Sequence, residues 1–186
     1  MYLPLLPLSV QVWVNSGVGS LSSIKDMSST TDESIINEVT TNITGPMILA
    51  RHLVPRLLAK KSPTNFLFTS SGLAYVPNGI FPTYCASKAY AHHFMVAIRQ
   101  TLQGSNVNII EIVPPFVRND FLAHQADMLK NVPAMSMQEF TKEIFDALDN
   151  SKAEDLKEVA AGTAKARVEG WRSSIGAMLV NAKLGG

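Results

Sequence analysis

The sequence has little cysteine and no strong excess of charge of either sign. Cys85 is the only cysteine among 186 residues, so no disulfide can form within the chain, which suits a reducing cytosol. The 16 Lys and Arg nearly balance the 15 Asp and Glu, and no basic run could neutralise a line of phosphates. No uninterrupted apolar run reaches the roughly 18 residues of a transmembrane helix. We therefore expect a soluble cytoplasmic protein that binds neither nucleic acid nor membrane.

The apolar start of the chain, residues 1–8, lacks the basic residues of a signal peptide and is interrupted by prolines. We interpret it as a loop before a buried strand. The overall hydrophobic share of 46% is enough to fill one substantial core. No internal repeat or convincing boundary divides the chain, so we predict a single domain over residues 1–186.

Short β-rich runs alternate with longer amphipathic stretches, which predicts an α/β domain with a parallel sheet. The predicted strands are residues 10–14, 65–69, 107–113 and about 158–161. A helix is expected from Asp32 or Glu33 to Leu58, bent at Gly45–Pro46, and others over residues 83–102 and 137–149. A terminal helix contains Trp171, which we interpret as a packing anchor.

Polar or turn-forming residues follow three of the predicted strands. They are Asn15, Ser70, Ser71, Pro114 and Pro115. In open parallel sheets, ligands bind where the carboxyl ends of the strands meet the helix starts. These residues should therefore share one functional edge.

Tyr84 and Lys88 stand four residues apart on a predicted helix, which places them on one face. A phenol with a pKa near 10 is a poor acid–base catalyst at neutral pH, but a nearby cation favours the phenolate. Lowering that pKa by about three units takes roughly 4 kcal/mol, which a lysine and an oxidised nicotinamide together could supply. Tyr84 could then protonate a carbonyl, or deprotonate an alcohol, as hydride moves from or to the cofactor.

The Tyr–Lys spacing alone is weak evidence, since composition predicts about 0.2 such pairs by chance. Other residues around this pair complete a pattern that resembles a known family. Ser71 lies 13 residues before Tyr84, and Asn42 stands in the context Thr-Asn-Ile-Thr-Gly. With the turn at Asn15-Ser16-Gly17 and the run Pro-Pro-Phe-Val-Arg-Asn at 114–119, the pattern resembles the short-chain dehydrogenase/reductase family. Residues 69–77 and the double proline look most like its uncharacterised DltE-like oxidoreductases.

The resemblance implies an NAD(P)-dependent oxidoreductase that transfers hydride between a carbonyl and an alcohol. It makes Tyr84 the acid or base, Lys88 the group that lowers its pKa and holds the ribose, and Ser71 the partner of the substrate oxygen. Asn42 would anchor a water for proton relay. Tyr84 and Lys88 would also contact NAD or NADP, together with the remaining cofactor-binding candidates Asn15, Ser16, Gly17, Pro114, Pro115, Val117 and Asn119.

The chain departs from the family pattern by lacking its first strand–helix units and their glycine-rich phosphate loop. We therefore expect an incomplete, Rossmann-like doubly wound sheet, the C-terminal two-thirds of a family member, with impaired activity and strand 10–14 at an open edge. Residues 16–22 are a poor substitute loop, because the third glycine is absent and no helix follows at once. The choice between NAD and NADP stays open, because the deciding residue belongs to the missing part.

Several features have less specific interpretations. His92 and His93 lack Cys or carboxylate partners at ligand spacing, so packing on the helix surface is favoured over a metal site. Residues 116–135 are expected to form a mobile loop that helps to bind a small carbonyl or alcohol substrate.

An alternative function is a non-catalytic remnant that binds a protein partner. The resemblance implies a homodimer through the helices that follow Asn42 and contain Tyr84.

Overall fold

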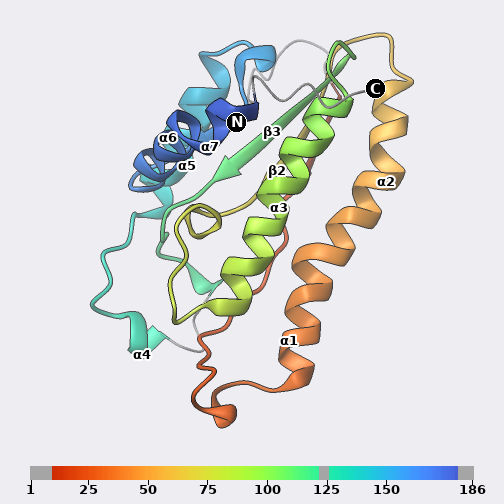
Figure 1. The fold of residues 1–186 in the computed structure, drawn as a ribbon. Helices are drawn as coiled ribbons and strands as arrows, with labels where there is room; N and C mark the ends of the chain where they lie inside the picture. Colours follow the sequence, from red (N-terminus) through yellow and green to blue (C-terminus); the bar gives the residue numbers. More distant parts are fainter. Residues whose placement is uncertain (1–9, 122–125, 180–186) are drawn as a thin grey trace.

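The computed structural model describes residues 10–121 and 126–179 (Figure 1). The expected loop at residues 1–8 lies outside this part of the chain. The sheet has the order β1-β2-β3-β4, with every neighbouring pair parallel. Its strands are β1 (Val10–Val14), β2 (Thr64–Thr69), β3 (Val107–Val113) and β4 (Glu158–Ala160). The expected parallel α/β sheet is confirmed, with β1 at one edge.

Helices cover both faces of the sheet (Figure 1). The α-helices of the described residues are α1 (Asp32–Val39), α2 (Gly45–Leu58), α3 (Pro82–Thr101), α4 (Ala126–Leu129), α5 (Met137–Asp149), α6 (Ala164–Ser173) and α7 (Ile175–Leu179), of which α4 lies away from the sheet. Successive strand residues face opposite sides, so β2 contributes to two cores. Phe66 and Phe68 pack with residues of α2 and α3, whereas Leu67 packs with Ile144 and Leu148 of α5. This three-layer arrangement confirms the doubly wound class.

The predicted elements agree closely with the structure, except within the first long helix. A π-helical turn, Thr40–Thr44, separates α1 from α2, so the irregularity begins before the bend predicted at Gly45–Pro46. Pro46 has no N–H to donate to the carbonyl of Asn42, and Gly45 donates instead to Thr40 five residues back. The wider turn carries Asn42 in its middle.

The segment after β3 is tied at its two ends. The backbone N–H of Arg118 donates to Met135 O, and the N–H of Met135 donates to Phe116 O, both over 2.9 Å. Part of the substrate loop predicted at 116–135, residues 122–125, lies outside the described residues. The paired ends bring the start of this segment back to the sheet edge, where Phe121 contacts Tyr84.

Candidate active site

The carboxyl end of β2 and the first turns of α3 form the centre of the site. Lys88 Nζ donates to the carbonyl of Thr69 over 3.0 Å and lies 5.6 Å from the centre of the Tyr84 ring. The Ser71 hydroxyl is close enough to the Tyr84 side chain to lower the pKa of its phenol. The hydroxyl of Ser71 also accepts from Leu73 N over 3.1 Å, which caps a short 3-10 turn at Gly72–Ala74. Three predicted residues, Ser71, Tyr84 and Lys88, are therefore neighbours.

Asn42 joins the turn after β1 to α3. Its Oδ1 accepts from Val18 N over 2.9 Å, and its Nδ2 donates to Val18 O over 2.8 Å and to Ser87 Oγ over 3.0 Å. The side chain is 1% exposed. These partners are protein groups, so Asn42 fixes the site's framework, and its expected part in a water relay stays a prediction.

The predicted turn at Asn15–Gly17 also reaches the site. Thr69 Oγ1 donates to Asn15 Oδ1 over 2.6 Å, while the carbonyl of Thr69 receives Lys88. A Cβ added to Gly17 would lie 3.2 Å from Lys88 Nζ and 3.4 Å from Asn42 Oδ1. Any larger residue would crowd the lysine, so glycine at this position keeps the turn close to the ammonium group.

Burial shifts the acid–base properties of two charged groups here. It lowers the pKa of Lys88 to about 8, although the negative charges of Glu38 and Glu111 oppose the shift. Burial also raises the pKa of Glu38 to about 7, against a hydrogen bond from Ser20 N and the charge of Lys88. Glu38 is 4% exposed and its Oε1 has no partner within the described part of the chain. Both groups titrate near neutral pH.

Burial raises the pKa of Tyr84 above its usual range; the Ser71 hydrogen bond lowers it, while the charge of Glu38 raises it further. Apolar groups surround the ring: Phe121 lies 5.7 Å away between ring centres, Phe81 lies 6.3 Å away, and a Cβ on Gly19 would come within 2.8 Å. The lowering of this pKa expected from the Lys88 charge is not seen in this arrangement. It stays a prediction for a site that also holds a cationic nicotinamide.

The residues after β3 are distributed around the edge. Pro114 O accepts from Gly72 N over 2.9 Å, beside Ser71, whereas Pro115 packs against the position of Gly162. Val117 pairs with Met135, and Asn119 Oδ1 accepts from Phe121 N over 3.0 Å. Ser16 is exposed. Of this set, Pro114 lies nearest to the Ser71 turn, and Asn119 shapes the segment that carries Phe121.

Sequence reasoning missed three buried polar residues near the site: Glu38, Glu111 and His92. His92 is 1% exposed and its Nδ1 lies 2.8 Å from Glu111 Oε2, so the prediction of a surface position is wrong for this histidine. It is right for His93, which is exposed. A usable signal existed, because Glu38 and His92 lie four residues from Asn42 and Lys88, and Glu111 is the only charged residue in an apolar strand.

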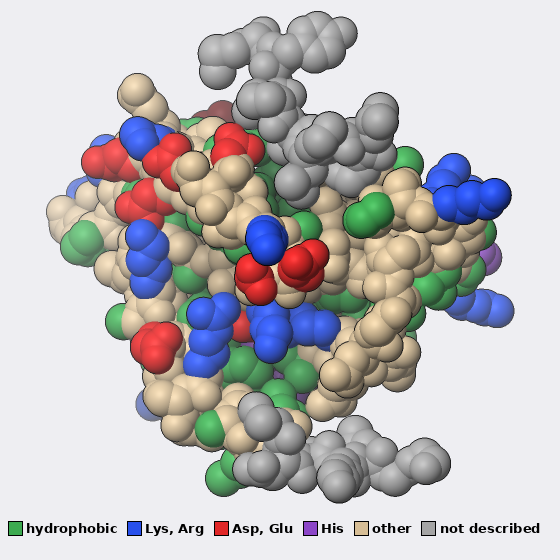
Figure 2. All heavy atoms as spheres, turned by 90° about the horizontal axis from the view of Figure 1, so that it is seen from above, with side chains coloured by type: hydrophobic (Ala, Val, Ile, Leu, Met, Phe, Trp, Pro, Cys, Tyr) green, Lys and Arg blue, Asp and Glu red, His purple; other side chains and the backbone are tan. Residues whose placement is uncertain are grey.

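Residues 10–121 and 126–179 contain no group of three or more His, Cys, Asp or Glu arranged to hold a metal ion. Within the same residues, no helix is long and apolar enough to cross a membrane. Figure 2 shows acidic and basic side chains lying next to one another on the face seen from above.

The ribose and nicotinamide end of a dinucleotide fits the residues present. Gly17, in the turn that lies against Lys88, leaves room that a Cβ would fill. Lys88 and Tyr84 supply polar groups there. The phosphate end does not fit equally well. After β1 the chain enters a three-residue 3-10 turn, Met27–Ser29, and the first α-helix begins only at Asp32, so no helix N-terminus directly follows the strand.

Fold and site together define a Rossmann-like domain with a Ser–Tyr–Lys constellation at its sheet edge. The short chain dehydrogenase model matches residues 9–130, so the chain belongs to the short-chain dehydrogenase/reductase family. It is 30% identical over 139 residues to the uncharacterized oxidoreductase DltE of Bacillus subtilis, covering 74% of this chain and 52% of that protein. It is 25% identical over 118 residues to chlorophyll(ide) b reductase NOL of Oryza sativa, covering 61% and 34%.

Solved structures support the same fold. A short-chain dehydrogenase from Sphingobium yanoikuyae in complex with NADPH superposes with a TM-score of 0.77 at 15% identity, covering 95% of this chain and 67% of that one. One from Burkholderia cenocepacia in complex with NADP gives 0.69 at 20% identity, covering 94% and 70%. The chain spans about half the length of DltE and about a third of NOL.

Proposed function

We propose that this chain provides the acid–base part of an NAD(P)-dependent oxidoreductase that interconverts a carbonyl and an alcohol. The observation that carries the proposal is the contact of Tyr84 with Ser71 beside Lys88, which itself holds the end of β2. Family membership supports it, as do relatives named as oxidoreductases.

In the reducing direction the Tyr84 hydroxyl donates its proton to the substrate oxygen, while Ser71 hydrogen-bonds that oxygen. In the oxidising direction Tyr84 accepts the proton from an alcohol. Lys88 Nζ lies 5.6 Å from the centre of the Tyr84 ring, and its positive charge stabilises the phenolate that forms transiently. The apolar rings of Phe81 and Phe121 pack edge-on against the Tyr84 ring and shield part of it from water, which strengthens these electrostatic interactions.

The cofactor supplies or accepts the hydride. Lys88 and Tyr84 would hold its ribose next to the nicotinamide, which Pro114 and Val117 would face, with Pro115 and Asn119 as further candidates on the same segment. The turn at Asn15–Gly17 would support the adenosine ribose. Solved relatives with bound NADPH, NADP or NAD support either dinucleotide. Because no helix N-terminus follows β1 directly, this chain's affinity should come mostly from the nicotinamide end.

Calorimetric titration tests the proposal directly. The purified chain should bind NADPH, NADH and reduced nicotinamide mononucleotide with similar affinity, and a Tyr84→Phe, Lys88→Ala double variant should lose binding. No heat of binding from a folded wild-type chain would contradict the proposal and favour the alternative of a non-catalytic interaction module.

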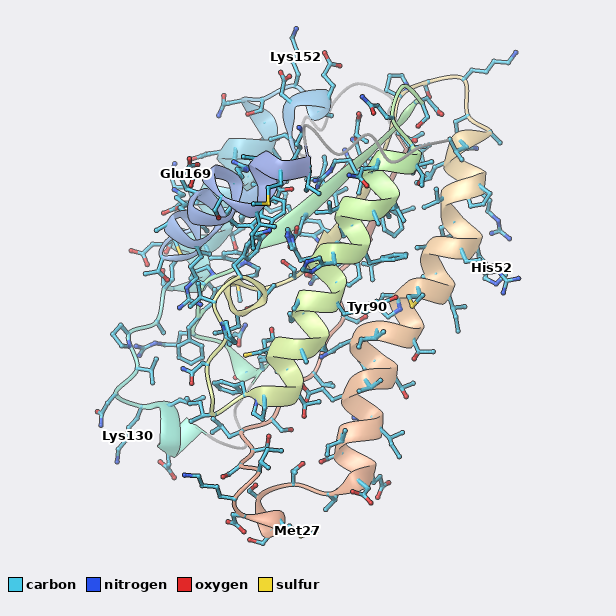
Figure 3. All side chains as sticks on the ribbon, viewed as in Figure 1. Met27, His52, Tyr90, Lys130, Lys152 and Glu169 are labelled. Carbon is cyan, nitrogen blue, oxygen red and sulfur yellow. The ribbon has the colours of Figure 1, made fainter. Side chains whose placement is uncertain are left out.

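We also propose that the chain forms a homodimer through α2 and α3. An apolar cleft of about 530 Å³ lies between these helices. It is lined mostly by apolar side chains, including Met47, Ile48, Val54, Phe94 and Ile98. Tyr90 of α3 lies between the two helices (Figure 3) and its hydroxyl contacts Met47 Sδ at 2.6 Å. Exposed apolar surface of this kind is typical of an interface.

A further inference from the structure

Three residues of α3, spaced four apart, meet three consecutive residues at the end of β2. Tyr84 contacts Ser71, and Lys88 donates to the carbonyl of Thr69. His92 reaches the remaining residue, Ser70, through the carboxylate of Glu111. Positions four apart on a helix share one face, so a single face of α3 contacts the whole end of β2.

Glu111 is the centre of the third contact and is fully buried on β3, at 0% exposure. The Ser70 hydroxyl donates to its Oε1, and His92 Nδ1 lies 2.8 Å from its Oε2. With the proton on Nδ1, both carboxylate oxygens accept a hydrogen bond. Burying a carboxylate is costly even when it is hydrogen-bonded, and an apolar residue would fit this strand at lower cost. Its presence calls for an explanation beyond packing.

Two aromatic side chains pack against the His92 ring. The ring centres of Tyr75 and Trp171 lie 4.4 and 4.5 Å from that of His92. Burial, and then the charges of Glu111 and Glu158, raise the pKa of the Tyr75 hydroxyl, so it stays a phenol. His92 therefore sits between α6 and the turn after β2, with little freedom to rotate.

The hydrogen bonds of Ser70 affect the direction in which the side chain of its neighbour Ser71 points. Ser70 N donates to Ile112 O over 2.9 Å, and Ser71 has extended backbone angles of φ −166° and ψ 154°. In extended backbone, successive side chains point to opposite sides. With Ser70 held toward Glu111, the Ser71 hydroxyl is directed to the other side, where Tyr84 lies.

We propose that Ser70, Glu111 and His92 form a positioning network that aligns Ser71 with Tyr84 and Lys88 from the buried side of the catalytic edge. The network touches neither substrate nor cofactor. It acts through the direction of Ser71 and through the charge of Glu111, which together with that of Glu38 favours the charged form of Lys88. The inference rests on the proposed function for its purpose, but its geometry can be tested without turnover.

Nuclear magnetic resonance of the whole chain, labelled at tyrosine Cζ and lysine Nζ, tests it. Tyr84→Phe and Lys88→Met assign the two signals. Ser70→Ala should shift the Tyr84 signal, and Glu111→Gln should in addition lower the pH midpoint of the Lys88 signal. Leu57→Ala is the control. Leu57 of α2 is buried in the hydrophobic core, and its truncation lowers stability without removing a contact of the network.

If Ser70→Ala and Glu111→Gln lower the unfolding temperature but leave both signals as Leu57→Ala leaves them, the network is only structural and the inference is wrong. Ser70→Ala removes one hydroxyl, so it keeps the test decisive if Glu111→Gln does not fold. Shifted signals without any cofactor binding by wild type would uphold the network and contradict the proposed oxidoreductase. Cofactor binding by wild type with unshifted signals in the variants would support the proposed oxidoreductase and contradict the network.

Discussion

At the scale of single residues, the site contains two buried charges whose stability costs fall in different pH ranges. Lys88 is 3% exposed and Glu38 is 4% exposed, and burial moves both pKa values toward neutrality. A fold optimised for stability alone would replace both by apolar side chains. Their retention is typical of functional sites, where perturbed pKa values concentrate.

Lys88→Met should stabilise the protein at pH 7. Because the pKa of Lys88 falls from 10.5 unfolded to about 8 folded, keeping it charged costs about 3 kcal/mol, and the lost hydrogen bond to Thr69 offsets about 1–1.5 kcal/mol of the gain. Wild-type stability should rise as pH increases from 8 to 10.5, so the variant's advantage should shrink there. Urea unfolding at pH 7 and pH 10 measures this; an equal difference at both values would contradict it.

Glu38→Gln should alter stability in a lower pH range. The folded pKa of about 7 exceeds the unfolded value of 4.5, so this carboxyl favours folding at low pH and loses that contribution as pH rises through 7. Relative to wild type, the variant should gain roughly 1–3 kcal/mol between pH 4.5 and pH 8. Unfolding curves across this range provide the measurement, with exposed Glu33→Gln of the same helix as control.

At the scale of elements, the π-helical turn and the end of β2 place the site. The turn Thr40–Thr44 directs Asn42 at both Val18 and Ser87, which joins three segments. The helix over residues 32–58 was predictable from its apolar spacing, and the proline signalled an interruption. The π turn itself was not, because it depends on the backbone partner that Gly45 finds at Thr40.

Asn42→Ala should destabilise the protein by about 2–3 kcal/mol, because it removes three hydrogen bonds and leaves Val18 N without its partner in a partly buried setting. Thermal unfolding measures the loss. Asn37→Ala, at an exposed position of α1, should change stability little. Equal effects of the two substitutions would show that the hydrogen bonds of Asn42 do not stabilise the protein.

The site could be predicted from the sequence only where residue spacing, a strand end or the family resemblance marked a residue. Tyr84, Lys88 and Ser71 were identified by spacing and resemblance, and the structure brings them together. Glu111 and His92 were not, because their pairing joins residues 19 positions apart on a strand and a helix. Periodicity identifies which face of an element is buried, but not which polar groups meet within it.

At the scale of the whole molecule, the chain presents an edge strand and an apolar cleft. Val10 and Trp13 of β1 are 42% and 39% exposed, and β1 is an edge strand of the sheet that the described residues form, a position that can accept a further strand. On the helical side, the cleft between α2 and α3 offers surface to a second copy. Assembly and cofactor binding are therefore expected to involve different surfaces.

Ile48→Asp should weaken the proposed dimer. Ile48 is 52% exposed and lines the cleft between α2 and α3, so a carboxylate there would be desolvated on association. Sedimentation velocity should show a dimer for wild type and a monomer for the variant. Ile175→Asp, with 57% exposure on α7, is the matched control and should leave the dimer intact. A monomeric wild type would exclude this interface.

The central claim is that Tyr84 transfers the proton during hydride transfer, and oxidation of a reduced nicotinamide by a panel of carbonyl compounds tests it most directly. Tyr84→Phe should lower the rate by at least about 100-fold. Tyr90→Phe, which changes a more exposed tyrosine of the same helix, should leave the rate unchanged. Equal rates for wild type and Tyr84→Phe, or no turnover by a folded wild-type chain, would contradict the account.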